Sequence, residues 1–257
     1  MNLFKALILG IVEGITEFLP ISSTAHLIIA SKLLNISQTE FQKFFEVFIQ
    51  SGAILAVVFI YIQYILKNPK IIKSVLISFI PTAIVGFLLH KVIKNIFFES
   101  FYLIIGSLFS VGLLFIVFEY LVKNKRIVLK KSIIQLTIFD AVVIGMVQSL
   151  SVVPGVSRAG AVMLGMMAFG YKREESAVYS FLLAVPTIFA AGAFDLYQSR
   201  KIIFSSLDNI WILIFGFWIS FIFAYISIKW LINYLKKNSL VVFGIYRIII
   251  SLLLFML

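Results

Sequence analysis

The chain has 257 residues, of which 62% are hydrophobic and only 13% are charged, and its mean hydropathy is +1.11. A soluble domain is about half apolar and about a quarter charged, so this composition excludes one and predicts an all-α polytopic membrane protein. The net charge of +11 does not indicate nucleic-acid binding, because the basic residues lie in short loops between apolar segments. The lack of cysteine excludes disulfides, thiolate catalysis and cysteine-bound metals.

Six apolar segments are long enough to cross a membrane as single helices. They lie near residues 45–66, 71–90, 101–122, 176–195, 210–233 and 241–257. Two further apolar regions, 3–34 and 132–170, each carry a proline-centred break, and neither half of either region could cross alone. We expect each to form a re-entrant helix-loop-helix pair, since broken backbone at membrane depth must be surrounded by protein or a wet cavity. The expected fold is therefore six transmembrane helices plus two re-entrant pairs.

The order of these segments, one re-entrant pair and then three spans, occurs twice. We predict a single membrane domain over 1–257, with halves 1–122 and 132–257 joined by a basic cytoplasmic loop at 123–131. Each half contains an odd number of spans, so the halves are inverted-topology repeats, whose broken helices typically build a binding site near the midplane. The supporting alignment pairs Pro20 with Pro154, Ser23 with Ser157, Ala25 with Ala159 and, after one gap, Gly10 with Gly145 and Glu13 with Gln148.

The distribution of Lys and Arg predicts the orientation of the chain in the membrane. Loops near 67–73, 123–131, 172–173 and 229–237 contain 13 of these residues. The opposite face contains seven, which are Lys5, Lys32, Lys43, Lys91, Lys94, Arg200 and Lys201. We place the richer face in the cytoplasm, so the first re-entrant pair opens to the outside and the second enters from the cytoplasm.

The first break carries carboxyl groups at a depth where an ionised side chain costs about 2.5–3.5 kcal/mol. Glu13 and Glu17 are four residues apart, which places them on one face of a helix that Pro20 ends. Two carboxylates this close in an apolar medium either share a proton or hold a cation. The spacing therefore indicates a functional pair.

The residues after this proline are suited to bind an anion. Ser22, Ser23 and Thr24 are typical of a helix start, where hydroxyls and free backbone N–H groups attract negative charge. His26 lies within helical reach of the two serine hydroxyls and is a candidate base. Together these residues predict a hydroxyl nucleophile, an imidazole and an anion-binding helix start.

The second break supplies a complementary set of groups. Gly155 and Gly160 allow close approach of the backbone, and Ser157 offers a hydroxyl. Arg158 is suited to bind two phosphate oxygens at once and stays charged at any relevant pH. If the two breaks meet, they form a phosphate-handling site inside the membrane.

Each of these residues also has a purely structural interpretation. Ser and Thr at a helix start are far more often caps than nucleophiles, and a membrane His is as often a packing hydrogen-bonder as a base. Glu13 and Glu17 would equally suit the ion site of a carrier, and Arg158 would suit a structural ion pair. The functional interpretation is favoured because all of these groups occupy two matched breaks.

These residues resemble a known family, the undecaprenyl-diphosphate phosphatases of the bacitracin-resistance type. The family's first motif, Glu-Gly-x-Thr-Glu-Phe-Leu-Pro-(Ile/Val)-Ser-Ser-Thr-(Ala/Gly)-His-Leu, is matched throughout by residues 13–27. Its second motif, Pro-Gly-x-Ser-Arg-Ser-Gly, is matched by residues 154–160 except at Ala159, which replaces a serine and so removes one potential phosphate donor. The similarity extends over the whole length, including residues 139–141 and Tyr246-Arg247.

The resemblance implies that the chain hydrolyses undecaprenyl diphosphate to undecaprenyl phosphate and inorganic phosphate at the outer face of the bacterial cytoplasmic membrane. This recycles the carrier lipid for peptidoglycan synthesis, cell-wall biogenesis and cell shape, and is linked to bacitracin resistance. A divalent cation, Mg²⁺ or Ca²⁺, is expected to assist. The residues carried over are Ser23, His26, Glu17 and Arg158 as catalytic, Ser22, Thr24, Gly155 and Ser157 as substrate contacts, and Glu13 and Glu17 as cation ligands.

The expected mechanism is attack on the terminal phosphorus by Ser23, deprotonated with help from His26. Direct attack by metal-activated water, with Ser23 only binding, is an open alternative. A lipid flippase or ion-coupled transporter would share the inverted repeats, and an intramembrane serine protease would share the Ser and His. The sequence leaves the oligomeric state open, a homodimer included.

Overall fold

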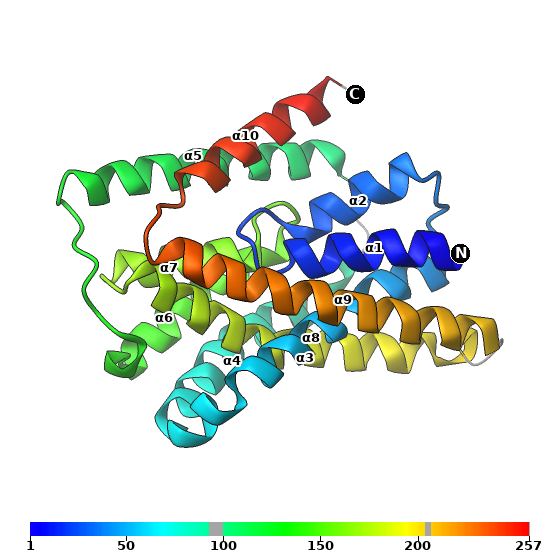
Figure 1. The fold of residues 1–257 in the computed structure, drawn as a ribbon, viewed down its shortest axis with the longest axis horizontal. Coiled ribbons are helices and arrows are strands. Elements are labelled where there is room, and N and C mark those ends of the chain that lie inside the picture. Colours follow the sequence, from blue (N-terminus) through cyan, green and yellow to red (C-terminus); the bar gives the residue numbers. More distant parts are fainter. Residues whose placement is uncertain (93–99, 204–206, 257) are drawn as a thin grey trace.

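The computed structural model describes residues 1–92, 100–203 and 207–256, with the side chains of 90–92 and 201–203 excepted, and this part of the chain is almost entirely helical (Figure 1). The α-helices are α1 (Leu3–Thr16), α2 (Ser23–Leu33), α3 (Glu40–Lys67), α4 (Pro69–Val92), α5 (Phe101–Lys123), α6 (Ile138–Ser149), α7 (Arg158–Ala168), α8 (Arg173–Ile203), α9 (Leu207–Leu235) and α10 (Val241–Phe255). Short 3-10 helices, η2 (Ile133–Gln135) and η3 (Leu150–Val152), flank α6. The chain is an all-α polytopic membrane protein, as predicted.

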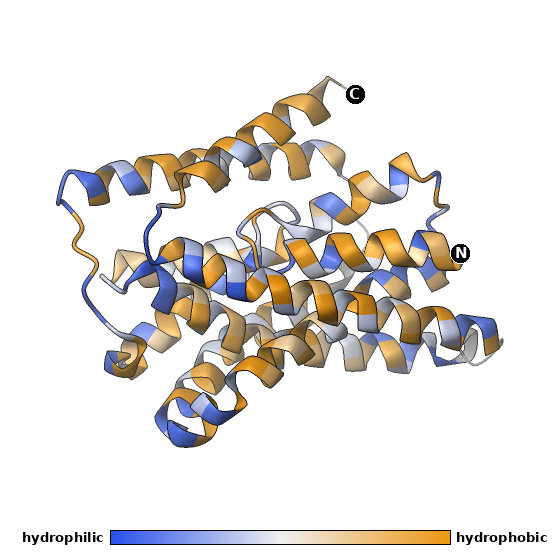
Figure 2. Ribbon diagram, viewed as in Figure 1, coloured by the Kyte–Doolittle hydropathy of each residue, from blue (hydrophilic) through white to orange (hydrophobic). Residues whose placement is uncertain are grey.

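Five of the six predicted spans are helices long and apolar enough to cross a membrane. These are α3, α4, α5, α8 and α9, and Figure 2 shows apolar residues along most of their length. The sixth, α10, has only 15 residues, about 22 Å of helix, which is shorter than the hydrocarbon core of a bilayer. It packs along α5, one of the five long helices, and its predicted last residue, at position 257, lies outside the described residues (Figure 1).

Both broken regions form a helix-loop-helix pair. The first loop joins α1 to α2 and the second joins α6 to α7, and the two loops lie near the centre of the molecule (Figure 1). From there α1 and α2 extend toward one end of the molecule, whereas α6 and α7 extend toward the other. Each of these helices has 14 residues or fewer, so neither pair could cross a bilayer twice.

The backbone shows that the sequence alignment of the two breaks was wrong by one residue at the serines. Leu3 and Ile138, which begin α1 and α6, are separated by 135 positions, and so are the serines that precede α2 and α7. Ser22 and Ser157 share an unusual positive φ, 73° and 72°, at this N-cap. The structural partner of Ser157 is therefore Ser22, not Ser23. The sequence alignment matched prolines, whereas the equivalent positions are set by where the backbone turns into the helix.

The first helix of each half packs on a long helix of the other half. The first helix of one half, α1, packs on α9, and its counterpart α6 packs on α4. A Cβ on Gly10 of α1 would lie 3.0 Å from the carbonyl oxygen of Gly216, and one on Gly145 of α6 would lie 2.3 Å from that of Ser78. Such matched close contacts are what two repeats related by a two-fold axis would give, and the inverted repeat itself stays a prediction.

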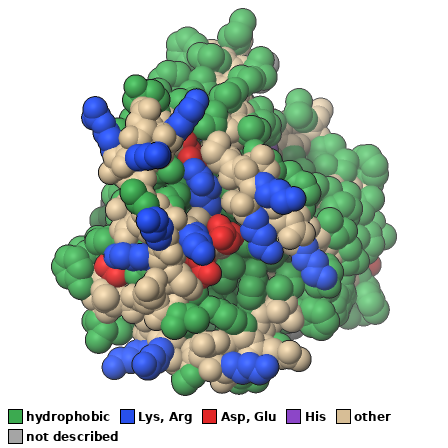
Figure 3. Space-filling model, turned by 60° about the vertical axis from the view of Figure 1, so that its left-hand side comes forward, with side chains coloured by type: hydrophobic (Ala, Val, Ile, Leu, Met, Phe, Trp, Pro, Cys, Tyr) green, Lys and Arg blue, Asp and Glu red, His purple; other side chains and the backbone are tan. Residues whose placement is uncertain are grey.

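The loops predicted to be cytoplasmic share one end of the molecule. Figure 3 shows Lys and Arg side chains gathered on this face, with a few acidic side chains among them. The buried side chain of Glu119 on α5 pairs with Arg173 at the start of α8 and accepts a hydrogen bond from the backbone N–H of Leu240, 2.9 Å away. These bonds tie α5, α8 and α10 together below the basic face. On the opposite face, Lys94 and the side chains of Lys91 and Lys201 lie outside the described residues.

Candidate active site

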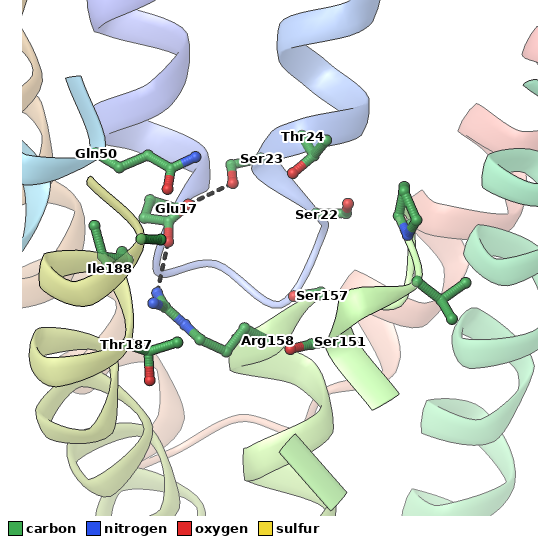
Figure 4. Close-up of a pocket in the computed structure, with 14 residues that line it drawn as sticks. Glu17, Ser22, Ser23, Thr24, Gln50, Ser151, Ser157, Arg158, Thr187 and Ile188 are labelled. Carbon is green, nitrogen blue, oxygen red and sulfur yellow. Dashed lines mark hydrogen bonds and ion pairs between the residues drawn. The ribbon is translucent and has the colours of Figure 1, made fainter. Parts of the chain in front are cut away.

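The two loops meet around a cavity of about 180 Å³ at the centre of the molecule (Figure 4). One wall comes from the first loop and α2, one from the second loop and α7, and the remainder from α3 and α8. The lining residues are Glu17, Ser22, Ser23, Thr24, Gln50, Ser151, Val153, Pro154, Gly155, Ser157, Arg158, Thr187, Ile188 and Ala191. Seven of the nine residues proposed from the sequence are therefore brought together.

Glu17 connects the two halves of the chain at the cavity. Its carboxylate accepts a hydrogen bond from the Ser23 hydroxyl, and its Oε1 lies 2.5 Å from Nη2 of Arg158 on α7 (Figure 4). Both side chains of the ion pair are largely buried, with exposures of 8% and 11%. The group placed to accept a proton from Ser23 is thus this carboxylate.

Arg158 keeps part of its hydrogen-bonding capacity unused. Its Nη2 is bonded to Glu17, and its Nη1 is 3.5 Å from the carbonyl oxygen of Ala184. Its Nε is buried and has no hydrogen-bond partner among the described residues. A buried donor without a partner costs free energy, and an anion in the cavity would remove that cost.

The start of α2 is open to an anion, whereas the start of α7 is partly closed. Ser157 caps its own helix by accepting a hydrogen bond from the backbone N–H of Gly160 at 3.1 Å. Ser22, at the equivalent position, makes no side-chain capping bond within the described part of the chain. The first backbone N–H groups of α2, beginning with that of Ser23, therefore keep their positive partial charge for a ligand.

The second loop is fixed by close contacts with α5. Gly155 has φ +93°, and a Cβ there would lie 2.1 Å from Oγ of Ser107, so only glycine fits without displacement. The Ser107 hydroxyl donates to the carbonyl oxygen of Pro154 at 2.5 Å. Gly155 thus contributes by allowing the backbone of the second loop to lie directly against α5.

Arg247 of α10 holds both loops, a role that sequence reasoning did not assign. Its fully buried guanidinium donates to the carbonyl oxygens of Pro20 at 3.1 Å, Gly155 at 2.5 Å and Val156 at 3.2 Å. One side chain therefore binds a carbonyl from each half. The sequence signal for it was an intramembrane arginine with no nearby carboxylate in the same segment.

His26 does not line the cavity. Its Nδ1 donates to the carbonyl oxygen of Ser22 at 2.8 Å, so its Nε2 accepts from the Tyr246 hydroxyl at 2.7 Å. Both ring nitrogens are engaged, and neither faces the hydroxyl of Ser23. This geometry ties α2 to α10 and gives no support to a base role for the imidazole.

Glu13 lies behind the cavity wall rather than on it. It is fully buried, and neither carboxylate oxygen has a hydrogen-bond partner among the described residues. It occupies the same helix face as Glu17, whose backbone N–H donates to the Glu13 carbonyl oxygen at 2.9 Å. An orphaned carboxylate of this kind fits a hard cation, although no three acidic or His side chains in the described ranges cluster closely enough to hold a metal alone. Phosphate oxygens would have to complete the coordination.

Three polar lining residues were missed because each lies outside the two motifs. Gln50 comes from α3, Ser151 from the second loop and Thr187 from α8. Ser and Thr are common in membrane helices, so only the Gln50 amide within an apolar span was a readable signal. Ala159, where the resembling family has serine, is 1% exposed and does not line the cavity.

Comparison with known proteins identifies the family of this chain. The family model described as "Bacitracin resistance protein BacA" matches residues 6–253, which include both loops. The chain belongs to this family. The residues that line the cavity all fall within the matched range.

Several curated relatives carry the name "Undecaprenyl-diphosphatase". The protein from Sulfurihydrogenibium sp. (strain YO3AOP1) is 48% identical over 254 residues, which cover 98% of each chain. The proteins from Persephonella marina and Aquifex aeolicus are each 44% identical, over 251 and 259 residues, covering 98% of this chain and 97% of the relative. The similarity therefore extends over the whole membrane domain.

Proposed function

We propose that this protein hydrolyses undecaprenyl diphosphate to undecaprenyl phosphate and inorganic phosphate. The observation that carries the proposal is the group of three side chains at the cavity, in which Glu17 binds both the Ser23 hydroxyl and Arg158. A hydroxyl nucleophile, a carboxylate base and a guanidinium are what phosphoryl transfer requires. The name of the relatives, at up to 48% identity, supports the same substrate.

The proposed reaction begins when the terminal phosphate enters the cavity. The helix-start N–H groups of α2 and the free Nε of Arg158 bind its oxygens, and the phosphate competes with Glu17 for the guanidinium. Glu17, released from this ion pair, takes the proton of the Ser23 hydroxyl. The serine oxygen then bonds to the terminal phosphorus as the bond to the lipid phosphate breaks.

The second half of the reaction restores the enzyme. The proton held by Glu17 leaves with the lipid monophosphate, and the free carboxylate then accepts a proton from the attacking water. The water oxygen bonds to the phosphorus as the bond to the Ser23 oxygen breaks, and the Ser23 oxygen takes the proton from Glu17 as inorganic phosphate departs. A divalent cation held by Glu13, Glu17 and phosphate oxygens would neutralise charge on the phosphates. Contacts to the phosphate from Ser22, Thr24 and Ser157 are part of this proposal.

The proposed location is the bacterial cytoplasmic membrane, with the cavity open to the outer face. The support is that four loops with 13 basic residues lie at the end of the molecule from which α6 and α7 enter. Figure 3 shows Lys and Arg side chains gathered on that face. The first loop would then be approached from outside, where the lipid diphosphate would present its head group.

The direct test is phosphate release from purified protein supplied with undecaprenyl diphosphate in detergent. We expect turnover by the wild-type chain and none by Ser23→Ala. Failure of the wild type to release phosphate, with or without added Mg²⁺ or Ca²⁺, would overturn the proposal. Movement of the lipid across vesicles without phosphate release would indicate a transporter instead.

A further inference from the structure

One polar side chain reaches the cavity from a helix that carries neither motif. Gln50 lies in the first half of α3, a 28-residue helix that is long and apolar enough to cross a membrane. It is the only α3 residue on the cavity wall in the described part of the chain. An amide inside an apolar span costs about 1–3 kcal/mol unless it is hydrogen-bonded, so its position requires an explanation.

The amide of Gln50 is not used to hold the fold together. Its side chain makes no hydrogen bond to any described residue, whereas Gln42, two turns earlier on the same helix, donates to Glu46 at 2.8 Å. Gln50 is half-buried, and Figure 4 shows its amide turned toward the pair formed by Glu17 and Ser23. The amide is therefore free to bind a ligand in the cavity.

The backbone next to Gln50 is held in a fixed position. A Cβ on Gly52 would lie 2.2 Å from the carbonyl oxygen of Phe217, so α3 touches α9 directly at this level. Ala53 is fully buried, and Ser51 Oγ lies 3.3 Å from where a Cβ on Gly192 of α8 would be. Because α3 packs closely against both α8 and α9, the backbone of Gln50 is held in a fixed position relative to the cavity.

The placement of Gln50 completes a set of donors on three sides of the cavity. Charge in phosphoryl transfer is spread over the three equatorial oxygens of the phosphoryl group. Arg158 approaches from α7 and the N–H groups at Ser23 approach from α2, while Gln50 approaches from α3 (Figure 4). A neutral amide adds a donor at this third side without adding charge, which suits a cavity that already contains an ion pair.

We propose that Gln50 is a further catalytic residue, whose amide N–H donates to an equatorial oxygen of the terminal phosphate while Ser23 attacks it. This inference rests on the proposed phosphatase function. It concerns how the phosphoryl group is held, and it assigns α3 a direct part in the chemistry.

The test compares Gln50→Ala, Gln50→Met and Gln50→Glu with the matched control Gln63→Ala, an exposed glutamine on the same helix outside the cavity. We expect both neutral variants to lower kcat by about 10²-fold, the loss typical of one donor to a developing oxyanion. Gln50→Glu should fall at least as far, because its carboxylate repels the phosphate. Gln63→Ala should match the wild type.

A second measurement separates catalysis from folding. Orthovanadate mimics the five-coordinate phosphorus of the transition state, and its inhibition constant should rise for Gln50→Met while the thermal unfolding midpoint stays near that of the wild type. The Gln50→Met variant is included because methionine is close to glutamine in size, whereas Gln50→Ala leaves a cavity that could prevent folding. If the neutral variants turn over substrate and bind vanadate within about twofold of the wild type, the role of Gln50 is refuted while the phosphatase function stands. If the wild type itself releases no phosphate, the phosphatase function fails instead.

Discussion

The assignment of the base is tested by replacing Glu17 with glutamine. The amide keeps the shape of the side chain but cannot take the proton of Ser23, whose hydroxyl donates to this carboxylate. Loss of a positioned general base lowers the rate by about 10²–10⁴-fold. At 1.36 kcal/mol per factor of ten, this is about 3–5 kcal/mol in the barrier.

The same substitution has a second, separable effect on stability. Arg158 loses its partner at 2.5 Å while its side chain stays 89% buried, since only 11% is exposed. Leaving a buried charge unpaired costs about 3–5 kcal/mol. Glu17→Gln should therefore lower the thermal unfolding midpoint in detergent as well as kcat.

The assay is phosphate release at saturating lipid diphosphate for Glu17→Gln beside His26→Gln and Tyr246→Phe. The histidine ring is occupied by the Ser22 carbonyl and the Tyr246 hydroxyl, so its loss should cost less than about tenfold, and the two variants at this contact should behave alike. Glu17 is not the base if His26→Gln is inactive while Glu17→Gln keeps more than about a tenth of wild-type kcat. In that case the imidazole would be the base.

Four further outcomes are expected. Ser23→Ala should abolish phosphate release yet still bind radiolabelled substrate, and residual turnover by this variant would favour direct attack by water. Arg158→Lys should lose nearly as much kcat/KM as Arg158→Ala, because an ammonium cannot bind two phosphate oxygens in one plane; near-normal turnover would mean that only the charge matters. Glu13→Gln should raise the Mg²⁺ concentration needed for half-maximal activity, and an unchanged requirement would exclude it as a cation ligand. Ala159→Ser should change turnover by less than about tenfold, since position 159 is buried away from the cavity, and a larger gain would contradict the geometry.

The sequence by itself determined the fold class and the location of the site. The length and composition of apolar segments are local properties of the sequence. Five membrane-spanning helices and both helix-loop-helix pairs could therefore be predicted without knowing how the helices pack. Ionisable groups such as Glu17 and Arg158 are costly at membrane depth, and this cost marked them as functional. Seven of the nine proposed residues accordingly lie on the cavity wall.

Only the tertiary structure decided which groups act on one another. Helical spacing placed His26 near Ser23, but the chain turns at Ser22, which has a positive φ, and the Ser23 hydroxyl donates to Glu17, the residue that follows α1. Hydrogen-bond partners across a non-helical loop depend on backbone direction, which residue spacing does not encode. The serines of the two loops were misaligned by one residue for the same reason, whereas the pairing of Gly10 with Gly145 keeps the offset of 135 found in the structure.

The contributions of Gln50 and Arg247 also required the three-dimensional structure. Neither residue belongs to a broken segment, and each reaches the loops only because its helix packs beside them. Which helices become neighbours is set by side-chain packing over the whole domain. For example, α1 packs on α9 of the other half, and α6 packs on α4. The sequence therefore located the chemistry, and packing determined the hydrogen bonds and ion pairs that make those groups a site.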